Sequence, residues 1–269
     1  AELLVVLTLW MLVRGLRRGL TFRRSVALGV LLGLILLTKV VAYAAVPVAA
    51  IGLYGAARLR RAGGEALRRW ALHLGVALLV AAALSGWWFV RNALIYGGLD
   101  VFGLHRHDLV VVGQPLTGPI TREAIQRFVL TTFRSFWGQF GWMAAPLSDR
   151  DYLMLTVITA LAAMGLLLYA LRVVKGEALI EAWRRWAAGL LVATVALVAG
   201  GMIAYNLTYL QAQGRYLFPA LVGLATLFGV GWRELWHPRY QGLMLGLMAV
   251  GLAGLTYVSL VRVVVPYFH

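Results

Sequence analysis

The segment QAQGRYLFPAL at residues 211–221 places one arginine, Arg215, between two long apolar runs. A guanidinium ion presents five N–H donors in a fixed plane and binds phosphate oxygens in pairs. We expect a helix to begin a few residues later, and the N–H groups at a helix N-terminus also attract anions. Gly214 permits close backbone approach, while Gln213 and Tyr216 add neutral donors. The segment therefore predicts a phosphate or pyrophosphate site; the alternative is an interfacial arginine that pairs with lipid headgroups.

A second cation, Lys39, interrupts the apolar segment at residues 25–57 within the sequence LLTKVVAYAAVP. A lysine at the centre of a membrane span costs about 2.5–3.5 kcal/mol on insertion scales, so it normally faces a partner or a water-filled cavity. The functional interpretation is a contact with an anion, most simply a lipid phosphate. The alternative is a lysine whose long side chain reaches the headgroups from a short hairpin.

Other polar residues are candidates for the same substrate cavity. Arg91 and Asn92 follow two tryptophans in SGWWFVRNALIYGG, although tryptophans at this level are ordinary membrane-interface residues. The sequence HRHD adds three polar side chains, His105, His107 and Asp108. Two histidines two residues apart share a face only on a strand, and no third ligand is identifiable. We therefore predict no metal site there and favour a solvated loop.

The composition indicates which elements must carry these residues. Of the 269 residues, 62% are apolar and 13% are charged, whereas a soluble domain has about 45–50% and about 25%. Several stretches reach the roughly 20 apolar residues needed to cross a bilayer. Because backbone polar groups in lipid must be satisfied within each segment, the crossings must be helices. The sequence predicts an all-α, polytopic transmembrane bundle, located in the cell (inner) membrane.

The net charge of +15 is explained by the distribution of arginines rather than by nucleic-acid binding. Sixteen of the 25 basic residues lie in four short segments. These are 14–24 with five, 58–69 with five, 172–185 with four and 233–239 with two. Such asymmetry marks the cytoplasmic side of a membrane protein. With no aromatic–basic groove and no soluble domain, nucleic acid is excluded as a partner. The absence of cysteine excludes disulfides, thiolate metal sites and cysteine nucleophiles.

The basic segments fix the expected topology. Residues 25–57 are too few for two full crossings, so we expect a re-entrant-like pair of short helices that meet near Thr38–Lys39. The remaining predicted crossings are 71–90, 150–171, 187–209, 217–232 and 241–262, with VVPYFH outside. All belong to one integral membrane domain, residues 1–269. Because the chain opens without Met inside an apolar run, we expect it to be the C-terminal part of a longer protein.

Residues 91–149 form the predicted outer-face segment of this domain. Within it, residues 121–133 read as an amphipathic helix that lies along the interface, with Thr121 as its cap. Ser148 is the predicted cap of the following helix. An excursion of this length between membrane helices is usually functional.

Four motifs, in order, resemble a known family. LLGLILLTKVVAYAAVPVAAIGL, GWWFVRNALIYGG, SFWGQFGW and QGRYLFPAL are similar to the C-terminal two-thirds of bacterial sugar transferases of the type C (GT-C) glycosyltransferase fold, the protein-mannosyltransferase and aminoarabinose-transferase superfamily. The resemblance covers most of the chain. It implies an enzyme that transfers a sugar from a polyprenyl-phosphate carrier to an acceptor at the outer face of the membrane. Lys39 matches the family's Thr-Lys turn and Arg215 its Gly-Arg-Tyr motif.

The resemblance supports the phosphate-binding roles of Lys39 and Arg215, whereas the other site residues are candidates from their own types and positions. Lys39, Arg215, Tyr216 and Arg91 would bind the lipid phosphate, and Gln213, Asn92, His105, His107 and Asp108 would line the substrate cavity. The family's catalytic aspartate lies in a first outer loop that is not in this sequence, so the catalytic residue is unassigned. No cofactor is assigned, and divalent-metal dependence stays open. The expected partners are a polyprenyl-phosphate-linked sugar and membrane lipids; protein partners, the sugar and the acceptor are unassigned.

Two alternatives stay open beside the transferase. A lipid-linked sugar transporter or flippase would need a polar route to the cytoplasmic side, but the expected helices carry no acidic residue in mid-membrane. A non-catalytic membrane subunit would be favoured if the chain were complete as it stands.

Overall fold

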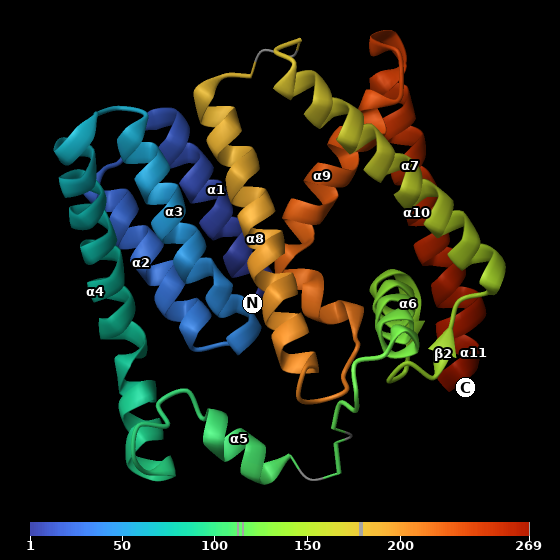
Figure 1. The fold of residues 1–269 in the computed structure, drawn as a ribbon, viewed down its shortest axis with the longest axis horizontal. Coiled ribbons are helices and arrows are strands. Elements are labelled where there is room, and N and C mark those ends of the chain that lie inside the picture. Colours follow the sequence, from blue (N-terminus) through green and yellow to red (C-terminus); the bar gives the residue numbers. More distant parts are fainter. Residues whose placement is uncertain (112, 115, 178–179, 269) are drawn as a thin grey trace. The chain divides into compact units, whose positions relative to one another are not determined.

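The computed structural model describes residues 1–111, 113–114, 116–177 and 180–268. In this part of the chain, almost all regular structure is helical (Figure 1). The chain forms two compact units. Unit 1 comprises Ala1–Thr117, Glu181–Leu210 and Pro219–Val222, and unit 2 comprises Gly118–Ile180, Gln211–Phe218 and Gly223–His269.

Six helical segments among the described residues are long and apolar enough to cross a membrane. They are Val40–Arg58, Gly63–Tyr96, Asp149–Val174, Ala182–Asn206, Gly214–Glu234 and Pro238–Phe268. The predicted all-α transmembrane fold is therefore confirmed, and the protein is a membrane protein. Its helices are generally longer than the sequence indicated, because a span that is capped or packed at its ends continues past its apolar core.

The described residues of unit 1 form a bundle of five long helices with two short ones at one end (Figure 1). The long helices are α1 (Glu2–Arg18), α2 (Phe22–Leu36), α3 (Ala45–Arg58), α4 (Gly63–Tyr96) and α8 (Ala182–Asn206). The short ones are the 3₁₀ helix η1 (Val40–Ala44) and α5 (Leu104–Val110). The helices pack closely because glycines lie at the crossings. A Cβ atom on Gly29 of α2 would lie 2.6 Å from the Ala77 carbonyl oxygen of α4.

The predicted reversal between two helices is present in unit 1, but its second arm, Val40–Arg58, is long and apolar enough to cross a membrane, a crossing that was not expected. Helix α2 ends at Leu36 and η1 begins at Val40, so the chain reverses around Thr38 and Lys39. The Thr38 hydroxyl donates to the Ile35 carbonyl, and the Tyr43 hydroxyl donates to the Leu36 carbonyl, both at 2.7 Å. The Tyr43 bond gives the Leu36 carbonyl at the end of α2 a donor, and the Thr38 hydroxyl adds a second donor to the Ile35 carbonyl, which also accepts from the Thr38 N–H.

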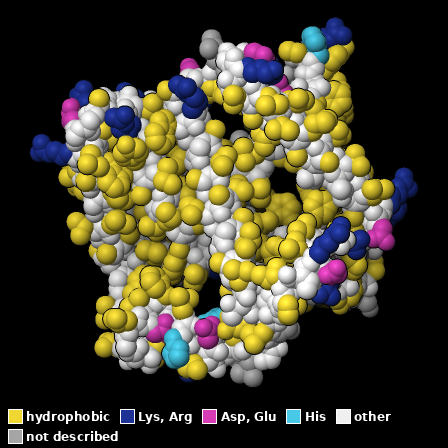
Figure 2. Space-filling view, viewed as in Figure 1, with side chains coloured by type: hydrophobic (Ala, Val, Ile, Leu, Met, Phe, Trp, Pro, Cys, Tyr) yellow, Lys and Arg dark blue, Asp and Glu magenta, His cyan; other side chains and the backbone are white. Residues whose placement is uncertain are grey.

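The arginine-rich loops of unit 1 gather at the opposite end from this turn (Figures 1 and 2). Arg60 donates to the Arg17 carbonyl at 2.8 Å, which joins the α3–α4 loop to the end of α1. The Arg17 guanidinium lies 5.8 Å from the ring of Trp183 at the start of α8. Three separate basic segments thus share one end of the unit, as the positive-inside pattern predicts. Figure 2 shows acidic and histidine side chains over α5 at the other end.

Unit 2 contains the remaining elements. They are α6 (Arg122–Gly138), β1 (Gln139–Phe140), β2 (Ala145–Pro146), α7 (Asp149–Val174), most of the 3₁₀ helix η2 (Gly214–Ala220), most of α9 (Leu221–Glu234), η3 (Pro238–Tyr240), α10 (Gln241–Ser259), the π-helical turn η4 (Leu260–Val264) and α11 (Val265–Phe268). Helices α7 and α9 touch at glycines, since a Cβ on Gly165 would lie 2.0 Å from the Gly231 carbonyl oxygen. Arg172 pairs with Glu234, so the basic ends of α7 and α9 also meet.

Both predicted helix caps in unit 2 are confirmed. The Thr121 hydroxyl accepts from the Ala124 N–H at 3.2 Å, and the Ser148 hydroxyl accepts from the Asp151 N–H at 3.2 Å. Helix α6 extends five residues beyond the predicted end at residue 133 and stops where β1 begins. Its Ile125 and Val129 side chains are exposed, which suits a helix with a lipid-facing stripe.

Two sequence expectations are wrong in detail. The final helix was expected to end at residue 262, but η4 and α11 continue it through Phe268; His269 lies outside the described residues. HRHD was expected in a loop and lies instead in α5. The Asp100 carboxylate accepts from the backbone N–H groups of His105 and Arg106, at 3.2 and 2.8 Å, and so supports this short helix from outside it.

Candidate functional site

Arg215 lies within η2 and is exposed. Its guanidinium carbon is 5.0 Å from the centre of the Trp142 ring and 5.8 Å from that of Tyr216. Two aromatic faces therefore hold the cation while leaving it accessible, and cation–π contacts at such sites contribute about 0.5–1 kcal/mol. The Tyr216 hydroxyl donates to the Gln211 side chain. The arrangement can present a positioned guanidinium to an anion.

Gly214 is required for packing rather than for approach to a ligand. A Cβ at this position would lie 2.2 Å from the Phe136 backbone nitrogen, so only glycine lets η2 touch α6. The Gly214 N–H donates to the Ser135 hydroxyl at 2.8 Å, and the Tyr216 N–H donates to the Gln213 carbonyl at 3.1 Å. These N–H groups do not form the expected phosphate cradle, because the chain enters η2 before α9 begins. The Arg215 side chain is the exposed cationic group of the segment.

Trp142 stands on the tight connection between β1 and β2. Trp142 and Met143 both have positive φ, 56° and 74°, a conformation that is costly for residues with a Cβ. Trp142 is also 84% exposed. A large apolar ring that is held outward in a strained backbone and stacked near Arg215 marks this connection as a candidate binding surface.

Lys39 is exposed and occupies the turn between α2 and η1 in unit 1. The turn is held against the end of α4 by Tyr43, whose ring lies 6.4 Å from the rings of both Phe89 and Phe102. The structure therefore places Lys39 at the end of unit 1 that is remote from the arginine-rich loops, not in the middle of a helix.

Arg91 and Asn92 lie near the C-terminal end of α4. The Arg91 guanidinium lies 4.8 Å from the Trp88 ring and donates to the Asn92 side-chain oxygen at 3.1 Å. Asn92 is buried, and its amide donates to the Val101 carbonyl at 3.1 Å. Asn92 thus connects the loop before α5 to α4, which is a structural contact. Arg91 is half-buried, and its guanidinium has further N–H donors beyond the one that contacts Asn92.

His107 and Asp108 join two tyrosines of the chain's later part that sequence reasoning missed. The His107 Nδ1 lies 3.0 Å from the Asp108 carboxylate, which also accepts from the Tyr209 hydroxyl at 2.7 Å. The His107 ring makes edge contacts with Tyr205 and Tyr209. Tyr205 and Tyr209 are four residues apart, the spacing that places side chains on one helix face, and this was the available signal.

The hydrogen bonds of this cluster alter its acid–base behaviour. The His107 and Tyr209 hydrogen bonds hold the pKa of Asp108 below its ordinary value. The same contact with Asp108 raises the pKa of Tyr209. At neutral pH the cluster therefore holds a carboxylate and a neutral phenol, which can orient the neighbouring imidazole.

His105 is exposed and lies on α5 with His107. Within the residues that the structure describes, no group of three or more histidine and acidic side chains is arranged to hold a metal ion.

The structure groups the predicted site residues by unit. Unit 2 brings together Arg215, Tyr216 and Gln213 in η2 and the segment before it. Unit 1 carries the others, Lys39, Arg91, Asn92, His105, His107 and Asp108. Trp142 was missed as a partner of Arg215, because nothing local in FWGQFGW specifies a strained turn.

Comparison with protein-family models, with curated proteins and with solved structures finds no significant match for this chain. The motif resemblance to GT-C glycosyltransferases is therefore an expectation from the sequence.

Proposed function

We propose that this chain carries the donor-lipid site of a membrane glycosyltransferase of the GT-C type. The donor would be a sugar on a polyprenyl phosphate, and the site would open at the outer face of the inner membrane. Arg215 and Lys39 would bind the carrier phosphate, with Arg91 and Tyr216 as further donors.

One observation carries the proposal. Lys39 directly precedes the candidate span Val40–Arg58, and Arg215 lies at the start of the candidate span Gly214–Glu234. Each span ends in one of the arginine-rich segments, at Arg58 and at Arg233. Positive-inside charge explains the cations at the far ends of these spans but not the lone cation at each near end. A negatively charged ligand on the side opposite the arginine-rich segments would account for both Lys39 and Arg215.

The chemistry follows from the charge that develops during transfer. The bond between the anomeric carbon and the carrier phosphate breaks, and its electron pair leaves with the phosphate. The acceptor oxygen forms the new bond to the anomeric carbon and gives up its proton. Guanidinium and ammonium groups that bind the phosphate stabilise the growing negative charge on the leaving group. The proton acceptor is not assigned to any residue of this chain.

The test is sugar transfer from a radiolabelled polyprenyl-phosphate sugar in proteoliposomes that contain the full protein. Arg215→Ala and Lys39→Ala should each lower transfer by at least about tenfold, because each removes a charge-assisted contact worth about 1.5–3 kcal/mol. The matched control is Arg122→Ala, an exposed arginine in the first turn of α6, which should leave transfer unchanged.

Other outcomes would refute the proposal or redirect it. Full activity in both variants removes the phosphate role of these residues. Movement of the labelled lipid across the bilayer without transfer indicates a lipid-linked sugar transporter. Neither transfer nor transport by the full protein indicates a non-catalytic membrane subunit.

A further inference from the structure

The arginine-rich end of unit 1 contains a convergence of charge that topology alone does not require. The segments 14–24, 58–69 and 181–185 hold twelve arginines and two glutamates. Three of the arginines are placed at the single turn between α1 and α2: Arg17 belongs to the last turn of α1, and the Arg24 and Arg60 side chains donate to the Gly19 and Arg17 carbonyls. This turn contains Gly19 with φ 87°, a conformation that favours glycine.

Hydrogen bonds to backbone carbonyls hold two of these guanidinium groups at the turn, and the Arg17 guanidinium lies over the Trp183 ring. Arg60 donates to the Arg17 carbonyl at 2.8 Å, and Arg24 donates to the Gly19 carbonyl. A Cβ on Gly19 would lie 3.7 Å from the Arg60 side-chain nitrogen, so glycine leaves room for that guanidinium. Each Arg24 or Arg60 contact uses one of five N–H donors, and the others can bind an anion.

The negative partners at this end are taken by other arginines. Glu65 pairs with Arg61 and Arg69, and Glu181 pairs with Arg184. Within the part of the chain that the structure describes, no carboxylate lies within 4.0 Å of Arg17, Arg24 or Arg60. Helix α2 also begins at this turn, and its positive N-terminal end adds to the field.

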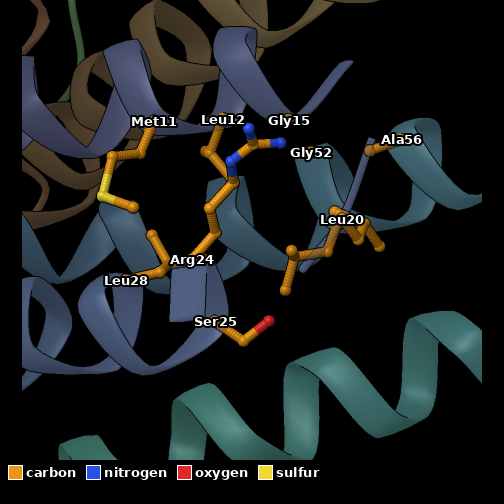
Figure 3. Close-up of a pocket in the computed structure, with 10 residues that line it drawn as sticks. Met11, Leu12, Gly15, Leu20, Arg24, Ser25, Leu28, Gly52 and Ala56 are labelled. Atoms are coloured by element: carbon orange, nitrogen blue, oxygen red, sulfur yellow. The ribbon is translucent and has the colours of Figure 1, made fainter. Parts of the chain in front are cut away.

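The surroundings of the turn are those of a membrane boundary. Trp183 lies against Arg17, and tryptophan is typical of the interface between lipid and water. Next to the turn, Arg24 borders a small pocket otherwise lined mainly by apolar residues, including Leu12 of α1, Leu20 of the turn itself and Leu28 of α2 (Figure 3). The cationic Arg24 side chain thus lies next to apolar side chains, as a phosphate headgroup and the acyl chains attached to it would require.

We propose that Arg17, Arg24 and Arg60 form a binding site for the phosphate headgroup of an anionic phospholipid in the inner leaflet. Basic pockets between transmembrane helices on the cytoplasmic side bind such headgroups. The site is separate from the proposed donor site, since it lies at the opposite end of unit 1 from Lys39, and it does not depend on the transferase activity.

The test is native mass spectrometry of the full protein in detergent, titrated with phosphatidylglycerol and, separately, with phosphatidylcholine. The wild type should retain phosphatidylglycerol in preference to phosphatidylcholine. The variant Arg17→Gln/Arg24→Gln/Arg60→Gln should bind phosphatidylglycerol about 100-fold more weakly, or about fivefold per arginine. The charge-matched control Arg58→Gln/Arg68→Gln/Arg185→Gln removes three exposed arginines of the same loops and should change binding little.

Three results would overturn the site. The first is an equal loss of phosphatidylglycerol affinity in the two triple variants, which would show only a general effect of positive charge. The second is unchanged binding in the Arg17→Gln/Arg24→Gln/Arg60→Gln variant. The third is a wild type that does not prefer the anionic lipid. If the first triple variant fails to fold, Arg17→Gln alone is compared with Arg58→Gln, because the Arg17 guanidinium contacts the Trp183 ring and does not hold the backbone of the turn. A fivefold difference supports the site, and equal affinities overturn it.

Discussion

Units 1 and 2 bury their apolar side chains to very different degrees. In unit 1, Leu32 and Ile35 are fully buried in a core shared by α1, α2, α3 and α4. In unit 2, the buried cluster is confined to Leu147, Tyr152 and Leu155, with a few partly buried neighbours. Among the candidate spans, half of the apolar stretch in Val40–Arg58 is buried, against 6% in Pro238–Phe268, and the other four spans lie between 17% and 28%.

The difference is physically reasonable in a membrane, where lipid tails solvate an apolar side chain as well as a neighbouring helix does. Unit 1 is held by interlocked small residues, and unit 2 by a few contacts around an apolar cavity of about 330 Å³ lined by α7, α9 and α10. We infer that unit 1 is a rigid support, whereas the helices of unit 2 can shift at low cost. The following substitutions test this difference between the two units.

The largest effect should come from Gly29→Ala in unit 1. The new Cβ would lie 2.6 Å from the Ala77 carbonyl oxygen and 2.7 Å from the Val80 Cβ, and the surrounding helices prevent relief. We expect the free energy of unfolding to fall by about 1–3 kcal/mol, the usual cost of overpacking. Denaturant titration in mixed micelles measures the change. In the control Gly75→Ala, nothing lies within 4 Å, so the substitution should be neutral or slightly stabilising.

Gly165→Ala in unit 2 should cost less than Gly29→Ala, although its clash is shorter. The new Cβ would lie 2.0 Å from the Gly231 carbonyl oxygen, but α7 and α9 can separate where little else packs between them. The same titration should show a smaller loss, and hydrogen exchange should rise mainly in α7 and α9. Gly229→Ala is the control, with nothing within 4 Å. A larger loss for Gly165→Ala than for Gly29→Ala would refute the contrast.

The smallest effect concerns the polar attachment of α5 within unit 1. The pKa of Asp108 is lowered by His107 and Tyr209, so its contribution to stability is present above its unfolded pKa of about 3.9 and is lost as pH falls through the folded value. Tyr209→Phe should raise the pKa of Asp108, and loss of the attachment on acidification should begin at higher pH.

Carboxyl ¹³C NMR titration of Asp108 measures this shift. Tyr205→Phe is the control, because the Tyr205 hydroxyl lies 3.4 Å from the His107 Nε2, on the other side of the imidazole from Asp108. Equal Asp108 titration curves in the wild type and in Tyr209→Phe would contradict the contact.

The features that follow from local patterns could be predicted from the sequence. Apolar length predicted the spans, charge predicted the shared ends of the basic loops, and the Thr121 and Ser148 caps followed from residue type alone. The reversal near Thr38–Lys39 followed from the distance between two basic segments. These signals work because lipid imposes one strong requirement on every span.

The features that depend on distant contacts could not be predicted. Helix α5 depends on Asp100, on Tyr205 near the end of α8 and on Tyr209 just beyond it, and its seven residues are too few to be stable alone. The sequence indicated that Gly214 allows a ligand to approach the backbone, but in the structure α6 packs against it at Phe136. The positive φ of Trp142 arises from the turn between β1 and β2; Gly141 marks the turn, but nothing in the residue types of Trp142 and Met143 indicates positive φ.

The central claim is that Lys39 and Arg215 face the side of the membrane opposite the arginine-rich loops. The chain has no cysteine, so single-cysteine variants can be labelled without background. In sealed right-side-out vesicles, a membrane-impermeant maleimide should label Lys39→Cys and Arg215→Cys, whereas Arg18→Cys and Arg233→Cys should react only after the vesicles are opened. Labelling of Lys39→Cys or Arg215→Cys from the same side as Arg18→Cys would contradict the account.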